Sequence, residues 1–184
     1  LIDGMTLGDG DRAEHVPYAR AGFAVISFDI PGMVTNDDEL VRGAREFKDG
    51  EGGIMNARAA LALALERFPR LDPNNVFVAG PSSAATLAPA LCARIERLRG
   101  CVAYAPDVDL IKSRGEIADM LEPYIPGERA FLASISPIEL VDQIRSPVMI
   151  FNARDDDVVP IAEIENYAQR AERANVRLSR VVVD

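Results

Sequence analysis

The feature that most constrains this chain is a serine placed where an apolar strand turns into a helix. Residues 75–88 read Asn-Val-Phe-Val-Ala-Gly-Pro-Ser-Ser-Ala-Ala-Thr-Leu-Ala, and the serine at the bend is Ser82. The run before Gly80 is apolar without alternation, which is typical of a strand covered on both faces. A buried strand that leads directly into a helix is the repeating unit of a parallel sheet, so the segment predicts an α/β fold.

The rest of the chain repeats this alternation of strands and helices. Apolar runs predict strands at 23–29, 76–80, 101–104, 148–152 and 176–183. Helical patterns lie at 11–21, 51–68, 83–97 and 161–174. The order predicts a mostly parallel sheet with right-handed crossovers and helices on both faces. With 48% apolar residues, the 184 residues can bury one core, and we expect residues 1–184 to form a single domain.

Two stretches interrupt the alternation. Residues 31–50 are polar and rich in turn formers, as expected for a surface excursion after a strand. Residues 106–136 carry short helical pieces and the helix-breaking pair Pro126-Gly127. We interpret the second stretch as a small lid or rim over a site rather than a separate domain.

Charge and composition exclude several classes of partner. The net charge of −9 argues against nucleic acid or an anionic membrane surface, because both need clustered Lys and Arg. No apolar run approaches the ~20 residues of a membrane span. Cys92 and Cys101 show no metal-ligand or disulfide spacing and are expected to be small buried residues. No metal or cofactor is expected, and the cellular compartment and oligomeric state stay open. Strand-like residues at both ends suggest a chain cut at both termini.

Ser82 is the candidate nucleophile. A serine hydroxyl needs a neighbouring base and an approach free of its own backbone, which a sharp strand-to-helix turn supplies. Gly80 and Ala84 flank the serine with small side chains, and the Ser83 N–H at the start of the helix could stabilise an oxyanion. Pro81 is unusual here, since it lacks an N–H and fixes its own φ. The alternative is that Ser82 and Ser83 only cap the helix.

An acidic loop follows a second buried strand. Residues 154–160 read Arg-Asp-Asp-Asp-Val-Val-Pro, and a carboxylate at the carboxyl end of a parallel strand is well placed to orient a catalytic histidine. Composition does not decide which aspartate has this role. The alternatives are capping of the next helix and, less well supported, a divalent metal site.

The N-terminal loop and the single histidine complete the candidates. Residues 3–10 form a glycine-rich turn whose Met5 N–H could be a second oxyanion donor, and they do not match a nucleotide-binding fingerprint. His15, the only histidine, falls in the expected helix at 11–21 and precedes the serine. We therefore interpret it as a surface or structural residue rather than a catalytic base.

The chain resembles the catalytic domain of the α/β-hydrolases, most closely the prolyl oligopeptidase and dienelactone hydrolase branch. The resemblance covers nearly all residues. It rests on 22–32 after the first loop, 71–80 before the serine, and 136–151 before the acidic loop. The branch's acid loop, His-Gly-x-x-Asp-x-x-Val-Pro, aligns with residues 152–160 and places Asp156 at the position of the acid.

The resemblance implies a serine hydrolase with Ser82 as nucleophile, Asp156 as triad acid, and the amides of Ser83 and Met5 as oxyanion hole. Its substrate would be a small-molecule ester or a peptide. The family's histidine follows the strand that here ends at Val183, so it is expected beyond Asp184, and the chain alone should be nearly inactive. The sequence departs from the family pattern at four positions: Asp3, Pro81, Ala84 and Asn152. These departures favour an alternative, a hydrolase-like binding domain without catalysis. A third hypothesis is the catalytic part of a longer protein with an N-terminal propeller or lid domain.

Overall fold

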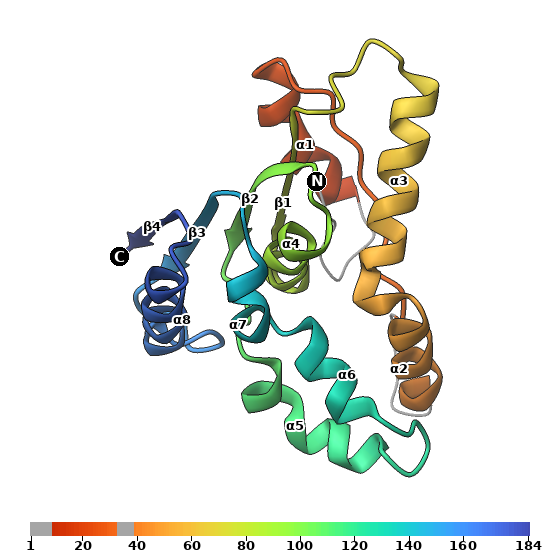
Figure 1. The fold of residues 1–184 in the computed structure, drawn as a ribbon, viewed down its shortest axis with the longest axis vertical. Coiled ribbons are helices and arrows are strands. Elements are labelled where there is room, and N and C mark those ends of the chain that lie inside the picture. The colour runs from red at the N-terminus through yellow and green to blue at the C-terminus, as the bar shows by residue number, and fades with distance from the viewer. Residues whose placement is uncertain (1–8, 33–38) are drawn as a thin grey trace.

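The centre of the molecule is a parallel four-stranded sheet (Figure 1). The computed structural model describes residues 9–32 and 39–184. The strands pair in the order β1-β2-β3-β4, and every pair is parallel. They are β1 (Val76–Pro81), β2 (Leu98–Tyr104), β3 (Val148–Ala153) and β4 (Leu178–Val183). All four carboxyl ends therefore lie at one edge of the sheet.

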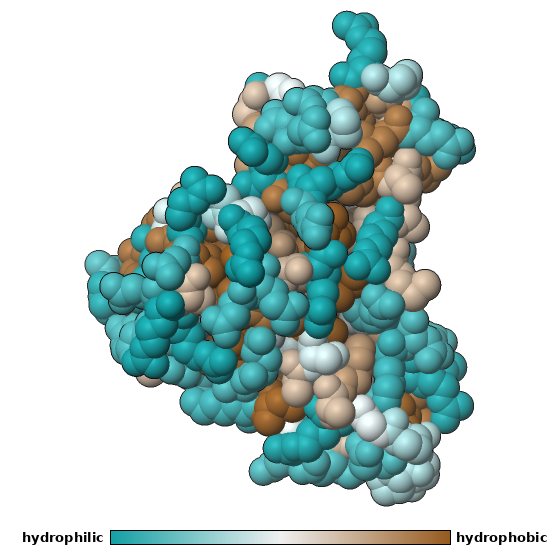
Figure 2. Space-filling model, viewed as in Figure 1, coloured by the Kyte–Doolittle hydropathy of each residue, from teal (hydrophilic) through white to brown (hydrophobic). Residues whose placement is uncertain are grey.

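Helices occupy the connections between strands and the segment before β1. They are α1 (Asp9–Arg20), α2 (Leu40–Asp49), α3 (Ile54–Arg67), α4 (Ser82–Arg94), α5 (Leu110–Leu121), α6 (Glu128–Ile135), α7 (Pro137–Leu140) and α8 (Ile161–Arg173), with short 3₁₀ turns at Glu51–Gly53 and Val141–Gln143. Because strand order equals chain order, right-handed crossovers place the connecting helices α4, α7 and α8 on the same face of the sheet. The view in Figure 2 is largely hydrophilic, and apolar atoms show mainly in recesses between polar side chains.

Helix α4 is the buried core of this face. Ala84, Ala85 and Ala88 have no exposed surface, and Leu91 has almost none. Small side chains let the helix lie close against β1 and β2, which it contacts along its length. The two cysteines are buried free thiols, Cys92 on this helix and Cys101 on β2, as the sequence predicted. A hydrogen bond with Cys92, together with burial, raises the pKa of the Cys101 thiol.

The elements predicted from apolar runs are confirmed with one exception. Residues 23–29 form no strand. In this segment the Phe23 ring lies edge-on to the Phe77 ring at 6.1 Å, Phe28 packs against the core, and the Asp29 carbonyl accepts a hydrogen bond from the Asn56 side chain at 2.8 Å. Among residues 9–32 and 39–184 its backbone has no strand neighbour with which to form a ladder. An apolar run predicts burial better than it predicts pairing.

The stretch interpreted as a surface excursion, 31–50, contains the regular helix α2. This helix contacts the segment that connects α5 to α6, beside which it lies in Figure 1. Lys48 Nζ donates to the Pro126 carbonyl at 2.7 Å, and the rings of Phe47 and Phe131 meet edge to face at 5.8 Å. The 106–136 stretch is thus a helical pair, α5 and α6, supported by α2.

Glu128 in the first turn of α6 is a buried acid whose carboxylate is only partly compensated by its neighbours. Its carboxylate is almost fully buried, Oε2 accepts no hydrogen bond from the described part of the chain, and the Lys48 ammonium lies 3.9 Å from it. Burial raises the pKa of Glu128, and Lys48 offsets this only in part. An acid whose folded-state pKa is raised loses its proton more readily in the unfolded chain. Its ionisation therefore lowers stability as the pH rises above the unfolded value.

We accordingly expect Glu128→Gln to raise the melting temperature at pH 7 by about 1–2 °C and to have no effect near pH 4, where wild-type Glu128 is also neutral. Thermal melts at the two pH values check this. Glu116→Gln, an exposed change on α5, is the control and should give no gain. A drop in the melting temperature of Glu128→Gln at pH 7 would show that the attraction to Lys48 outweighs the cost of burial.

Candidate active site

Ser82 lies on a sharp turn between β1 and α4. The strand ends at Pro81 with an extended backbone (φ −91°, ψ 160°), and Ser82 then adopts φ +51° before the helix continues. Left-handed backbone costs a residue with a Cβ roughly 1–2 kcal/mol, so this conformation is held by its surroundings. Its result is that Ser82 is exposed while Ala84 and Ala85, two and three residues later, are completely buried. Pro81 is accommodated because an extended terminal strand position lies close to its fixed φ.

The start of α4 leaves backbone donors beside Ser82. The residue before the helix, Pro81, makes no side-chain capping bond, and no other side chain in residues 9–32 and 39–184 is seen to cap the first N–H groups of the helix. The Ser83 N–H belongs to this group, and the positive end of the helix dipole adds to its attraction for an anion. The hydroxyl of Ser83 is buried and has no hydrogen-bond partner among the residues that the structure describes. Ser83 therefore remains a candidate through its backbone, while the other candidate donor, Met5, lies outside the described residues.

The acidic loop after β3 distinguishes one aspartate from its neighbours. Asp156 is half-buried, and its Oδ1 accepts hydrogen bonds from the N–H groups of Val158 at 2.9 Å and Val159 at 2.8 Å. Asp155 and Asp157 are exposed. The loop thus holds the Asp156 carboxylate in one orientation. The alternative of helix capping is wrong for this cluster, because the residue that precedes α8 is Pro160, and in the described part of the chain Asp156 bonds to Val158 and Val159 rather than to the first turn of α8.

Asn152, one of the four departures from the family pattern, holds the same loop through hydrogen bonds from its side chain. Its side chain is buried near the end of β3, and its amide group donates to the carbonyls of Ala153 at 3.0 Å and Val159 at 3.4 Å. Val159 is therefore held from both sides, by Asn152 through its carbonyl and by Asp156 through its N–H. The departure is compatible with an ordered acid loop.

The two candidate side chains lie at the same edge of the sheet. Ser82 follows β1 and the acidic loop follows β3, with only β2 between them. Two inter-strand spacings amount to about 10 Å, a separation that one imidazole ring and its hydrogen bonds can span. His15 lies on a different element from the one that carries the base in the family pattern. It lies on α1, as expected from the sequence, and α1 precedes β1 rather than following β4.

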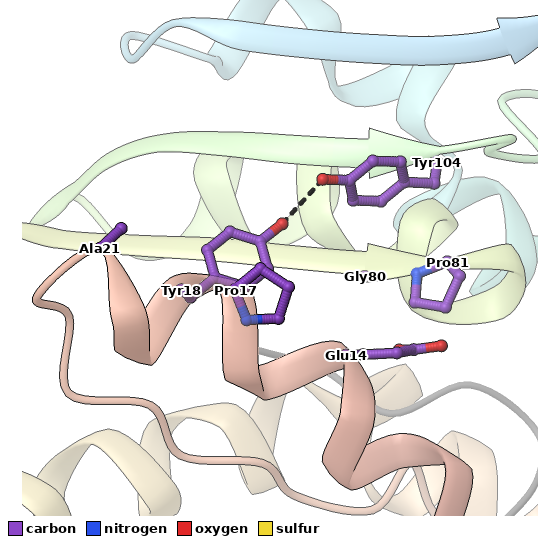
Figure 3. A pocket seen from close by; sticks show the side chains of 7 residues that line it. All are labelled: Glu14, Pro17, Tyr18, Ala21, Gly80, Pro81 and Tyr104. Atoms are coloured by element: carbon purple, nitrogen blue, oxygen red, sulfur yellow. Dashed lines mark hydrogen bonds between the residues drawn. The ribbon is translucent and has the colours of Figure 1, made fainter.

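A cavity of about 530 Å³ lies between α1 and the end of β1 (Figure 3). Its lining includes Gly80 and Pro81, the two residues that precede Ser82, and Tyr18 and Tyr104, whose hydroxyls are 2.7 Å apart. Burial, followed by this hydrogen bond, raises the pKa of Tyr18. No local sequence pattern indicates the tyrosine pair, because the residues are 86 positions apart.

The loop after β2 is a further part of the site that sequence reasoning missed. Ala105 has φ +54°, and Asp107 follows at the edge of the sheet next to Ser82's strand. The Asp107 carboxylate accepts a hydrogen bond from the Ser113 hydroxyl on α5, and the Asp107 N–H donates to Thr86 on α4. The sequence feature that could have indicated this loop is the aspartate after Pro106, because ligands of parallel sheets bind at the carboxyl ends of the strands.

Among the described residues, nothing in the site is arranged to hold a metal. No group of three or more His, Cys, Asp or Glu side chains gathers anywhere in the part of the chain that the structure describes. No helix in that part is long and apolar enough to cross a membrane.

Comparison with known proteins decides the family. The sequence matches the prolyl oligopeptidase family over residues 11–184. The chain belongs to this family. A comparison with curated protein sequences gave no significant match.

Solved structures place this prolyl oligopeptidase family chain in the α/β-hydrolase fold. An acylaminoacyl peptidase from Pyrococcus horikoshii superposes with a TM-score of 0.64 at 12% identity, over 84% of this chain and 26% of that protein. An acetyl xylan esterase from a Thermoanaerobacterium species superposes with a TM-score of 0.66 at 20% identity, over 98% of this chain and 65% of that protein. A puromycin-hydrolysing peptidase from Mycobacterium tuberculosis gives 0.56 at 22% identity, over 68% of this chain and 20% of that protein. The chain therefore spans about a quarter of the length of the first of these peptidases.

Proposed function

We propose that this prolyl oligopeptidase family chain carries the nucleophile and the acid of a serine hydrolase that cleaves an ester or a peptide-type bond. The observation that carries the proposal is the left-handed backbone of Ser82 at the strand-to-helix turn. A strained, exposed serine at this point is the arrangement that frees a hydroxyl for attack on a carbonyl. A serine that only capped the helix would need no such backbone.

In the proposed reaction Ser82 Oγ attacks the substrate carbonyl carbon and loses its proton to a base, and the leaving group departs with a proton from that base. Water then releases the acyl group from Ser82 by the same route. The N–H groups of Ser83 and Met5 would hold the oxyanion, and Asp156 would orient the base. The substrate is a small-molecule ester or a peptide, and residues 1–184 act as one domain.

The proposal assigns the base of this reaction to none of these 184 residues. His15 is their only histidine, and it lies on α1. The proposal therefore assigns the base to a histidine outside these 184 residues, as the resemblance to the family implies. The alternative is a binding domain with a hydrolase fold and no catalysis, and the departures from the family pattern at Asp3, Pro81, Ala84 and Asn152 are the observation that favours it.

A fluorophosphonate probe tests the proposal on the longest natural chain that contains these residues. We expect one covalent adduct by intact mass, located on Ser82 by peptide mapping and absent from Ser82→Ala. An adduct requires an activated serine and hence a base. A folded natural chain that forms no adduct would contradict catalysis and favour the binding domain.

A further inference from the structure

We propose that Thr86 is a positioning residue that holds the backbone of Ser82 by tying it to the loop after β2. The inference rests on the proposed function, in which Ser82 is the nucleophile. Thr86 is buried one helical turn after Ser82. Its Oγ1 donates to the Ser82 carbonyl at 3.4 Å and accepts from the Asp107 N–H at 2.9 Å. One hydroxyl therefore connects the nucleophile turn to the neighbouring strand end.

The bond from the Asp107 N–H distinguishes Thr86 from an ordinary threonine inside a helix. Threonine often bonds to the carbonyl four residues earlier, and such a bond alone would signify little. Here the shorter bond comes from the Asp107 N–H, and the single proton of the hydroxyl is donated to the Ser82 carbonyl. The Ser82 carbonyl is held in this way at the residue whose left-handed φ opposes the ordinary helical conformation.

The loop that anchors Thr86 is itself held at several points. The Ser136 hydroxyl accepts from the Leu110 N–H at 3.1 Å and donates to the Val108 carbonyl at 3.3 Å, and the Ile138 N–H donates to the same carbonyl at 2.9 Å. Ser136 is completely buried. The Ala105 N–H donates to the Phe151 carbonyl of β3 at 2.8 Å. The Ile138 and Ala105 bonds do not depend on the Ser136 hydroxyl, so they keep the loop in place when that hydroxyl alone is removed. The Thr86 hydroxyl, in contrast, is the one that contacts Ser82.

The same loop leads into α5, so the Thr86 hydroxyl also connects Ser82 to the helical rim. Asp107 accepts from Ser113 on α5, and Lys112 on α5 pairs with Glu163 on α8 at 3.0 Å. The nucleophile turn, the rim and the helix after the acid loop form one continuous set of contacts. Loss of the Thr86 hydroxyl would break this set at the point nearest to Ser82.

The test compares two buried hydroxyls that hold the same loop, only one of which contacts Ser82. Phosphonylation kinetics with a fluorophosphonate probe, on the longest natural chain, give a maximal rate constant and a half-saturating probe concentration. The variants are Thr86→Val, which keeps the shape without the hydroxyl, Thr86→Ser, which restores it, and Ser136→Ala. Melting temperatures are measured for all of them.

We expect Thr86→Val to lower the maximal rate constant about tenfold, the factor that corresponds to one hydrogen bond, with little change in half-saturation. Thr86→Ser should stay within about twofold of wild type, and Ser136→Ala should lose stability but keep its labelling rate. If Thr86→Val does not fold, Thr86→Ala gives the same comparison, since it relieves the β-branched helix position.

Two results would overturn the inference while leaving the proposed function in place. One is that the wild type is labelled at Ser82 and folded Thr86→Val is labelled with the same maximal rate constant. The other is an equal slowing in Ser136→Ala, which would show a general loss of rigidity. A folded wild type that takes no label at Ser82 overturns the proposed function and the inference together.

Discussion

Ser82→Gly is expected to raise the melting temperature by about 2–4 °C while it removes all covalent labelling. Glycine adopts positive φ as readily as negative φ, so the substitution relieves the roughly 1 kcal/mol that the left-handed backbone costs at Ser82. Loss of the hydroxyl removes the nucleophile, and hydrolysis by the natural chain should fall by about 10⁶-fold. Thermal melts and probe labelling of the same preparations measure both effects.

Two neighbouring variants separate backbone strain from loss of the hydroxyl. Ser82→Ala removes the nucleophile but keeps a Cβ, so it should abolish labelling without a gain in stability. Ser83→Gly makes the same chemical change one residue later, where the backbone is helical, and should lower stability by roughly 0.5 kcal/mol. Equal stability changes for glycine at positions 82 and 83 would contradict the strained turn.

Asp156→Asn is expected to lower hydrolysis by the natural chain about 10⁴-fold with little loss of stability. The asparagine Oδ1 can still accept from the N–H groups of Val158 and Val159, so the loop keeps its shape. The neutral side chain can no longer stabilise an imidazolium or fix the tautomer of the base. Steady-state rates with a chromogenic ester, together with thermal melts, check the prediction.

The neighbouring acids provide matched controls in the same loop. Asp155→Asn and Asp157→Asn remove the same charge from exposed positions and should change the rate by less than about threefold. A loss as large as that of Asp156→Asn in either control would reassign the triad acid. Equal small losses in all three would mean that the loop contributes only a diffuse negative field.

The sequence predicted the sheet and its main helices because each depends on a local pattern. The apolar runs of β1 and β3 and the small residues around Ser82 are readable within a few positions. Residues 23–29 have the same kind of pattern but form no strand, because a strand also requires a neighbour that no local pattern reports. Composition could not separate Asp156 from Asp155 and Asp157, since the difference arises from which loop amides each carboxylate meets.

The contacts around Ser82 could not be predicted from local sequence patterns, because the residues that meet there are far apart in the chain. Thr86 and Asp107 are 21 positions apart, and Tyr18 and Tyr104 are 86 apart. Their meeting follows from the order of the strands, which is a property of the whole fold. Family resemblance assigned roles to aligned positions but not the hydrogen bonds that hold them.

The agreement between strand order and chain order has a consequence for how the protein is made. Synthesis releases β1 first, and each later strand then pairs with the strand completed just before it. Among these four described strands, the sheet can therefore grow from β1 towards β4 without reopening a finished pair. Parallel pairing is slow because every pair must wait for a long crossover. Sequential growth during translation limits how many unpaired strands are exposed at once.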